Sequence, residues 1–117
     1  MLDQADRLQR QFFQLHHEAQ GGPVWEPPAD ILETPDALFI EVALPGVIPD
    51  TVRVLIDSST LAVQGDRPFA AREDMNVLRM EIPYGRFERH IDLKGGHFEI
   101  QENVLENGSL KLVLKKI

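Results

Sequence analysis

The sequence contains no cysteine in its 117 residues, which excludes disulfide bonds, thiolate metal sites and cysteine nucleophiles. It also lacks any run of about 20 apolar residues, the length that a membrane-spanning helix needs. The first ten residues, MLDQADRLQR, carry charges where a signal peptide has an apolar core. Together these absences predict a cytoplasmic protein with no membrane span.

Basic residues are few: 12 lysines and arginines stand against 19 acidic residues, for a net charge of −7. A nucleic-acid partner is not expected, because phosphate binding needs a basic face. No glycine-rich loop leads into a helix and no Gly-x-Ser-x-Gly occurs. The four histidines, His16, His17, His90 and His97, show no metal-ligand spacing. We therefore expect no enzyme activity, cofactor or metal.

The pattern of residues 1–22 predicts an amphipathic helix, because apolar residues recur there at steps of three and four. Gly21-Gly22-Pro23 ends this helix. Its apolar stripe either packs on the rest of the chain or acts as an arm for self-assembly and partner binding. The arm residues expected to make contacts are Leu8, Phe12, Phe13 and Leu15.

From Trp25 onward the apolar period changes to two, in short runs separated by turn signals. This pattern indicates an all-β antiparallel sandwich or barrel. The Asn107-Gly108 turn predicts a hairpin that fixes the last strand inside the sandwich. Residues 66–78 match no strand pattern, and a loop of that length is usually functional or mobile.

Four motifs stand together in this region. They are Ala43-Leu44-Pro45-Gly46-Val47, Leu61-Ala62-Val63-Gln64-Gly65, Tyr84-Gly85-Arg86-Phe87-Glu88-Arg89 and Asn107-Gly108-Ser109-Leu110. Their order and spacing resemble the alpha-crystallin domain of bacterial small heat-shock proteins, over about residues 25 to 115. The resemblance implies an immunoglobulin-like antiparallel β-sandwich over residues 23–117, preceded by the helical arm at 1–22.

The resemblance also implies a function: ATP-independent binding of partly unfolded client proteins, which prevents their aggregation during stress. In the family, an apolar groove lies between two edge strands. The corresponding residues here are Val52, Val54, Ile56, Val104 and Leu105. Each of them could instead belong to the core. Asn103 and Ser109 replace the alanine and valine of the family pattern, which makes this region more polar.

Dimerisation is the second implied property, through a strand that the 66–78 loop exchanges with the partner's strand near residues 30–33. The corresponding interface residues are Ile31, Phe69, Met75, Val77 and Arg89. Arg89 could pair with a carboxylate or be an ordinary surface arginine. In the family, a tail with an Ile-x-Ile/Val motif follows the last strand and builds large assemblies. Because this chain ends at Ile117, we expect a homodimer or small homo-oligomer.

Two other functions are compatible with the same residues. One is a co-chaperone or scaffold module of the sandwich type that docks on a single folded partner. The other is a structural component of a coat or envelope.

Overall fold

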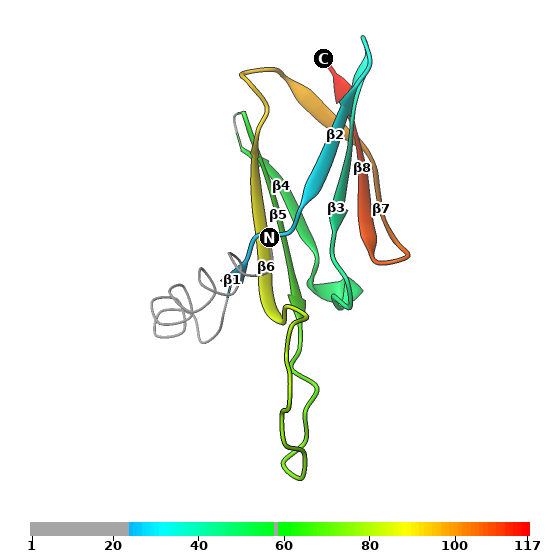
Figure 1. The fold of residues 1–117 in the computed structure, drawn as a ribbon. Helices are drawn as coiled ribbons and strands as arrows, with labels where there is room; N and C mark the ends of the chain where they lie inside the picture. Colours follow the sequence, from blue (N-terminus) through cyan, green and yellow to red (C-terminus); the bar gives the residue numbers. More distant parts are fainter. Residues whose placement is uncertain (1–23, 58) are drawn as a thin grey trace.

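The computed structural model describes residues 24–57 and 59–117, and within these ranges the chain is a two-layered β-sandwich (Figure 1). This confirms the all-β antiparallel sandwich expected from the sequence. The described strands are β1 (Val24–Trp25), β2 (Ala29–Glu33), β3 (Ala37–Ala43), β4 (Arg53–Asp57), β5 (Thr60–Arg67), β6 (Gly85–Asp92), β7 (Phe98–Glu106) and β8 (Ser109–Lys116). One 3-10 turn, η1 (Pro49–Thr51), precedes β4. The expected helix at 1–22, with Leu8, Phe12, Phe13 and Leu15, lies outside the described residues.

Each layer is a four-stranded sheet. Sheet A has the order β1-β6-β5-β4, and sheet B has the order β2-β3-β8-β7. Neighbouring strands are antiparallel except β1 and β6, which run parallel. The last strand, β8, lies between β3 and β7, as the Asn107-Gly108 turn predicts. Both turn residues have positive φ, 54° and 76°, which is what a type I′ hairpin requires.

The core lies between the two sheets and follows from the period-two pattern, because alternate side chains of a strand point to the same face. Strand β8 contributes Leu110, Leu112 and Leu114, all at most 1% exposed. Opposite them in the cluster, sheet A contributes Leu61, Val63 and Phe87. The described core contains no buried charged or polar residue, so the sandwich is held together by apolar packing.

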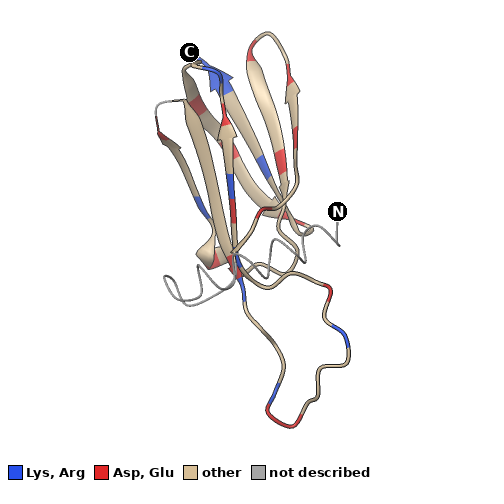
Figure 2. Cartoon of the chain, turned by 60° about the vertical axis from the view of Figure 1, so that its left-hand side comes forward, with Lys and Arg blue, Asp and Glu red and all other residues tan. Residues whose placement is uncertain are grey.

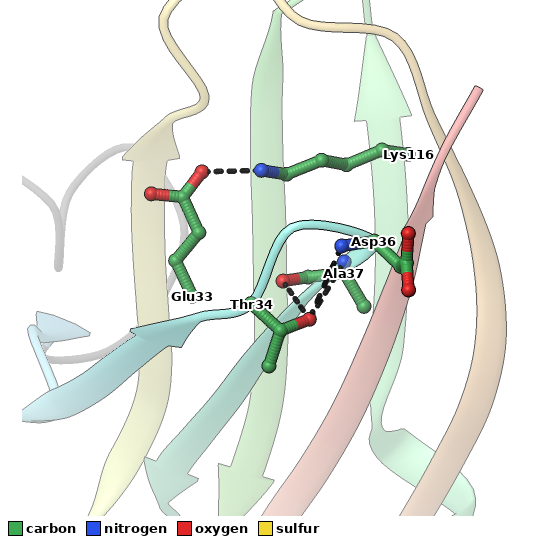
Figure 3. Close-up of polar contacts among 5 residues, drawn as sticks. All are labelled: Glu33, Thr34, Asp36, Ala37 and Lys116. Atoms are coloured by element: carbon green, nitrogen blue, oxygen red, sulfur yellow. Dashed lines mark hydrogen bonds and ion pairs between the residues drawn. The ribbon is translucent and has the colours of Figure 1, made fainter.

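Polar contacts join the end of β8 to the β2–β3 turn at one end of sheet B (Figure 3), and we call the ion pair of Glu33 and Lys116 the clasp. Lys116 Nζ lies 2.6 Å from Glu33 Oε2, and the Lys116 backbone N–H donates to the carbonyl of Asp36 at 2.8 Å. Within the turn, Thr34 Oγ1 accepts from the backbone N–H of Ala37 at 3.0 Å. These contacts connect the end of β8 to the β2–β3 turn and so restrain the edge strand β2.

Candidate functional site

The sandwich leaves four strand edges unpaired within the described residues: β1 and β4 in sheet A, and β2 and β7 in sheet B. Only residues 26–28 separate β1 from β2, so these two edges lie on the same side of the sandwich. The β4 and β7 edges are therefore on the opposite side. An unpaired edge presents free N–H and C=O groups that can pair with another chain.

On the β4 side, the residues expected from the sequence do face inward. Val54 is paired with Val63, and Ile56 with Leu61, and both partners are completely buried. Val54 and Ile56 are nevertheless only half-buried, because no strand covers them beyond the edge. Val52, also half-buried, packs against the same core. The edge of sheet A thus carries a row of three partly open apolar side chains.

On the β7 side, the structure separates two residues that the sequence analysis had grouped. Leu105 is paired with Leu110 and packs against the core. Val104 is paired with Lys111 and lies on the outer face of sheet B, where it is 47% exposed. Adjacent residues of a strand point to opposite faces, so placing both in one groove was wrong. Val104 does not join Val52, Val54, Ile56 and Leu105.

Further residues of β7 take inner positions beside Leu105, and of these the sequence analysis had named only Asn103. Asn103 is paired with Leu112, and Ile100 with Leu114, so both lie on the inner face. A register shift between Ile100 and Glu102 interrupts the simple alternation. Phe98 is half-buried against the core. The apolar pair Phe98 and Ile100, two residues apart, was the available sequence signal.

The connection between β5 and β6 projects from the body of the sandwich (Figures 1 and 2). It spans residues 68–84 and contains no strand in the single chain. The loop therefore begins and ends later in the sequence than the expected range of 66–78. Asp66 and Arg67 are still part of β5 and pair with β6. Three predicted interface residues lie on this loop and are exposed: Phe69, Met75 and Val77.

A second exposed segment, residues 78–82, follows on the same loop and has the alternation of a strand. Leu78, Met80 and Ile82 are all exposed, with Leu78 at 95%. Between them, Arg79 Nη1 lies 3.2 Å from Glu81 Oε2, as side chains two residues apart do on one face of an extended chain. The loop therefore presents a charged face and an apolar face, and the described part of the chain leaves the apolar face exposed.

The root of the loop is fixed by three contacts. Arg67 Nη1 donates to the carbonyl of Pro83 at 2.8 Å, and the rings of Phe69 and Tyr84 lie 5.0 Å apart. The Arg67 side chain passes over Gly46, where an added Cβ would lie 2.7 Å from Arg67 Nε. Gly46 therefore makes room for the arginine that joins the two ends of the loop.

Near the tip of the loop, Arg72 and Asp74 form a fully exposed ion pair, with Arg72 Nε 3.0 Å from Asp74 Oδ1. The hydrogen bond from Arg72 lowers the pKa of Asp74, and the same contact raises the pKa of Arg72. At the same place the Met75 backbone N–H donates to the carbonyl of Arg72 at 3.0 Å, which closes a turn in the loop.

The remaining interface candidates lie at the β1–β2 side. Ile31 is an exposed residue of β2 whose register partner is the buried Ile40. Arg89 is paired with the buried Val63 and so points to the inner face of sheet A. Its Nη1 donates to the carbonyl of Pro27 at 3.0 Å. Among the described residues, Arg89 forms no ion pair with a carboxylate, and its hydrogen bond holds the β1–β2 connection.

Histidines and acidic residues form no metal-binding arrangement in the described part of the chain. No group of three or more metal-ligating side chains occurs there. His90 lies beside Glu88, with 2.8 Å between Nε2 and Oε2. No helix within the described ranges is long and apolar enough to cross a membrane.

Comparison with known proteins agrees with this architecture. Residues 30–117 match the model of the Hsp20/alpha crystallin family. The 17.7 kDa class II heat shock protein of Arabidopsis thaliana is 33% identical over 94 residues, covering 77% of this chain and 60% of that protein. Small heat shock protein C2 of Rickettsia felis is 32% identical over 92 residues, again covering 77% and 60%. The matches thus span about three fifths of the length of these relatives.

Solved structures of similar proteins show the same fold. The hspA of Xanthomonas axonopodis superposes with a TM-score of 0.69 at 28% identity, covering 79% of this chain and 94% of that one. Heat shock protein 16.0 of Schizosaccharomyces pombe gives the same TM-score and identity, covering 79% and 87%. With the match of the family model over residues 30–117, these similarities show that the chain belongs to the Hsp20/alpha crystallin family.

Proposed function

We propose that this chain is an ATP-independent holdase, a chaperone that binds partly unfolded proteins and keeps them from aggregating. Membership of a small heat shock protein family suggests a chaperone role. The observation that carries the proposal is the β4–β7 side of the sandwich. There, two unpaired edges accompany half-buried apolar side chains that face inward, Val54, Ile56 and Leu105 among them.

An extended client segment can use both features of this side. Its backbone pairs with the free edge of β4 or β7, and its alternate side chains contact the inward apolar residues. Burying about 100 Å² of apolar surface contributes about 2.5 kcal/mol, and ordering of the client offsets much of this. Binding is therefore weak and reversible at one site and becomes useful when several sites act together. Such capture needs no nucleotide, cofactor or catalytic group.

We also propose that two chains dimerise by exchanging their long loops. Among the described residues, the strand-like segment 78–82 has an exposed apolar face, and β2 has an unpaired edge that the ion pair of Glu33 and Lys116 restrains. Pairing of the loop of one chain with β2 of the other would satisfy both. Light scattering after size-exclusion chromatography should give a homodimer or small homo-oligomer. A cage of a dozen or more chains would contradict this part of the proposal.

We also propose a cytoplasmic location for the chain, which its cysteine-free composition supports.

The test of holdase activity is the light scattering of a heat-denatured model client without nucleotide. The full chain should suppress scattering at near-stoichiometric ratios. Val54→Glu should weaken suppression, because it places a charge among the inward apolar side chains. Leu55→Glu is the matched control: the same change on the next residue of β4, which faces outward and is 62% exposed.

Circular dichroism should show that both variants keep the sandwich, and Leu105→Glu repeats the test from the β7 side. Suppression lost in Val54→Glu and Leu105→Glu but kept in Leu55→Glu supports the proposed site. Equal suppression by all three folded variants would mean that clients bind at another place on the chain. Failure of the unmodified chain to suppress scattering would refute the holdase function itself.

A further inference from the structure

A row of apolar side chains lies on the outer face of sheet B, over the three neighbouring strands β2, β3 and β8. Leu32, Phe39 and Val113 are register neighbours on β2, β3 and β8. Leu32 is 69% exposed and Phe39 is 43% exposed, and Val113 is half-buried. We call these three residues the outer stripe. They face away from the core, so the packing of the sandwich does not explain them.

Charged residues flank the outer stripe along β3 and β8, with the negative charge on β3 and the positive charges on β8. On one side of it, Glu41 of β3 stands beside Lys111 of β8. On the other side, Lys115 of β8 stands beside Ala37. Lys111 Nζ lies 3.5 Å from Glu106 Oε1, whereas neither Glu41 nor Lys115 has an ion-pair partner among the described residues. Strand β3 thus carries the acid and strand β8 carries the bases.

We propose that the outer stripe is a self-association surface that stacks sheet B against sheet B of a second copy. A two-fold axis parallel to the strands, midway between β3 and β8, places β3 of each copy over β8 of the other. Phe39 then packs on the partner's Val113. Glu41 comes to lie over the partner's Lys111, and the symmetry repeats both contacts. An isologous interface requires a patch that is complementary to itself. Here the negative charge on β3 faces the positive charge on β8 of the other copy, so the patch is complementary to itself.

The size of the patch sets the strength of this contact. Phe39 and Val113 of each copy and the two ion pairs bury less than the roughly 1,000 Å² that a stable interface needs. Leu32 comes to lie over the partner's Glu102, on β7. The stack is therefore a weak contact that forms at high concentration or between chains already held together by another contact. It uses neither the β4–β7 side nor the long loop, so it does not depend on the proposed function.

Two charge-reversal variants test this surface. Each should lose self-association on its own, and mixing the two should restore it only if the charges meet between chains. Glu41→Lys alone would place lysine over the partner's Lys111, and Lys111→Glu alone would place glutamate over the partner's Glu41. Each variant should therefore lose self-association through this face. In a mixture of the two variants, opposite charges face each other at both symmetric positions. Within each variant chain, residues 41 and 111 still carry like charges side by side, so mixing does not relieve the repulsion inside a chain.

The measurement is fluorescence-detected sedimentation of a trace of labelled Glu41→Lys chain against increasing concentrations of unlabelled chain. The unlabelled chain is either Glu41→Lys or Lys111→Glu. Association through loops contributes equally to both titrations, whereas stacking contributes only to the unlike pair. We expect about tenfold tighter association for the unlike pair, from the sign reversal at two contacts. Asp57→Lys in the outer face of sheet A is the control for the labelled chain, since it makes the same change of charge elsewhere.

Two outcomes of these titrations would overturn the proposal. The first is equal association of the like and unlike pairs. The second is a preference for Lys111→Glu shown as strongly by Asp57→Lys as by Glu41→Lys, because the change at Glu41 would then not be its cause. Phe39→Ser in the unmodified background should reduce association as well. If it leaves sedimentation unchanged and instead weakens client suppression, the stripe binds clients and not a second copy.

Discussion

Replacement of Gly46 by alanine tests how the Pro45-Gly46 turn and the root of the long loop are connected. Gly46 has φ of +70°, a conformation that side chains other than glycine rarely adopt. The new Cβ would also lie 2.7 Å from Nε and 3.0 Å from Cδ of Arg67. The arginine must move away, and we expect its hydrogen bond to the carbonyl of Pro83, 2.8 Å long, to break.

The magnitude follows from these two effects. A left-handed conformation costs a residue with a Cβ about 1–2 kcal/mol. The smaller conformational entropy of alanine in the unfolded chain returns about 0.4–1 kcal/mol. Loss of a half-exposed hydrogen bond from a charged donor adds about 1.5 kcal/mol. The free energy of unfolding should therefore fall by about 2 kcal/mol, which lowers Tm by about 10 °C in a domain of this size.

The assay is urea unfolding at a fixed protein concentration, followed by the fluorescence of Trp25, the only tryptophan in the sequence. Gly95→Ala is the control, because Gly95 has φ of +75° and an added Cβ would meet nothing within 4 Å. It should lose only the conformational part, about 0.5–1 kcal/mol. If Gly46→Ala is no less stable than Gly95→Ala, the contact between the turn and Arg67 does not hold the loop root.

Three further substitutions test other parts of the chain. Phe87→Ala removes a side chain that is 2% exposed and should lower the free energy of unfolding by about 3–5 kcal/mol; a loss below 1 kcal/mol in the same urea assay would show that Phe87 is not core. Glu33→Gln should cost less than about 1 kcal/mol, because its ion pair with Lys116 is partly exposed; the loss should disappear at 1 M salt, and a larger, salt-independent loss would rule out an electrostatic clasp. Arg72→Ala should raise the pKa of Asp74 toward its ordinary value, since Arg72 is the main cause of its lowering; an unchanged midpoint in an NMR titration of the carboxyl would mean that the pair does not form in solution.

The sandwich could be predicted from the sequence because its central strands obey a strict period of two. In β3 and β8, each apolar residue at an alternate position is buried between the sheets. The Asn107-Gly108 turn fixed the order of the last two strands, because its two positive φ values admit few other residue pairs. Local turn chemistry and hydrophobic alternation therefore agree here, and each confirms the other.

Edge strands were harder to assign because one of their sides has no neighbour to impose a pattern. In β7, Val104 and Leu105 are both apolar, and only the pairing with Lys111 and Leu110 decides which of them faces inward. The register shift after Ile100 also depends on the neighbouring strand and leaves no mark in the sequence. The acceptor of Arg89 could not be predicted for a related reason: the carbonyl of Pro27 is 62 residues away in the sequence.

The chemistry of the open edges explains how they can stay open without uncontrolled assembly. Glutamates and aspartates recur along the two exposed edges of sheet B. They are Asp30 and Glu33 on β2, and Glu99, Glu102 and Glu106 on β7. Like charges directly opposite each other across a strand pair are destabilising, and charged edge residues are a known defence against edge-to-edge aggregation.

Pairing of one β7 edge with another would bring such acids together and is therefore disfavoured. A neutral or basic extended segment meets no such repulsion and reaches the inward apolar side chains behind the edge. The loop segment 78–82 carries one arginine and one glutamate, already paired with each other, and so can approach β2 without adding net charge. The acidic edges thus disfavour direct pairing of one β7 edge with another and leave room for segments that bring no further negative charge, including residues 78–82 of a second copy.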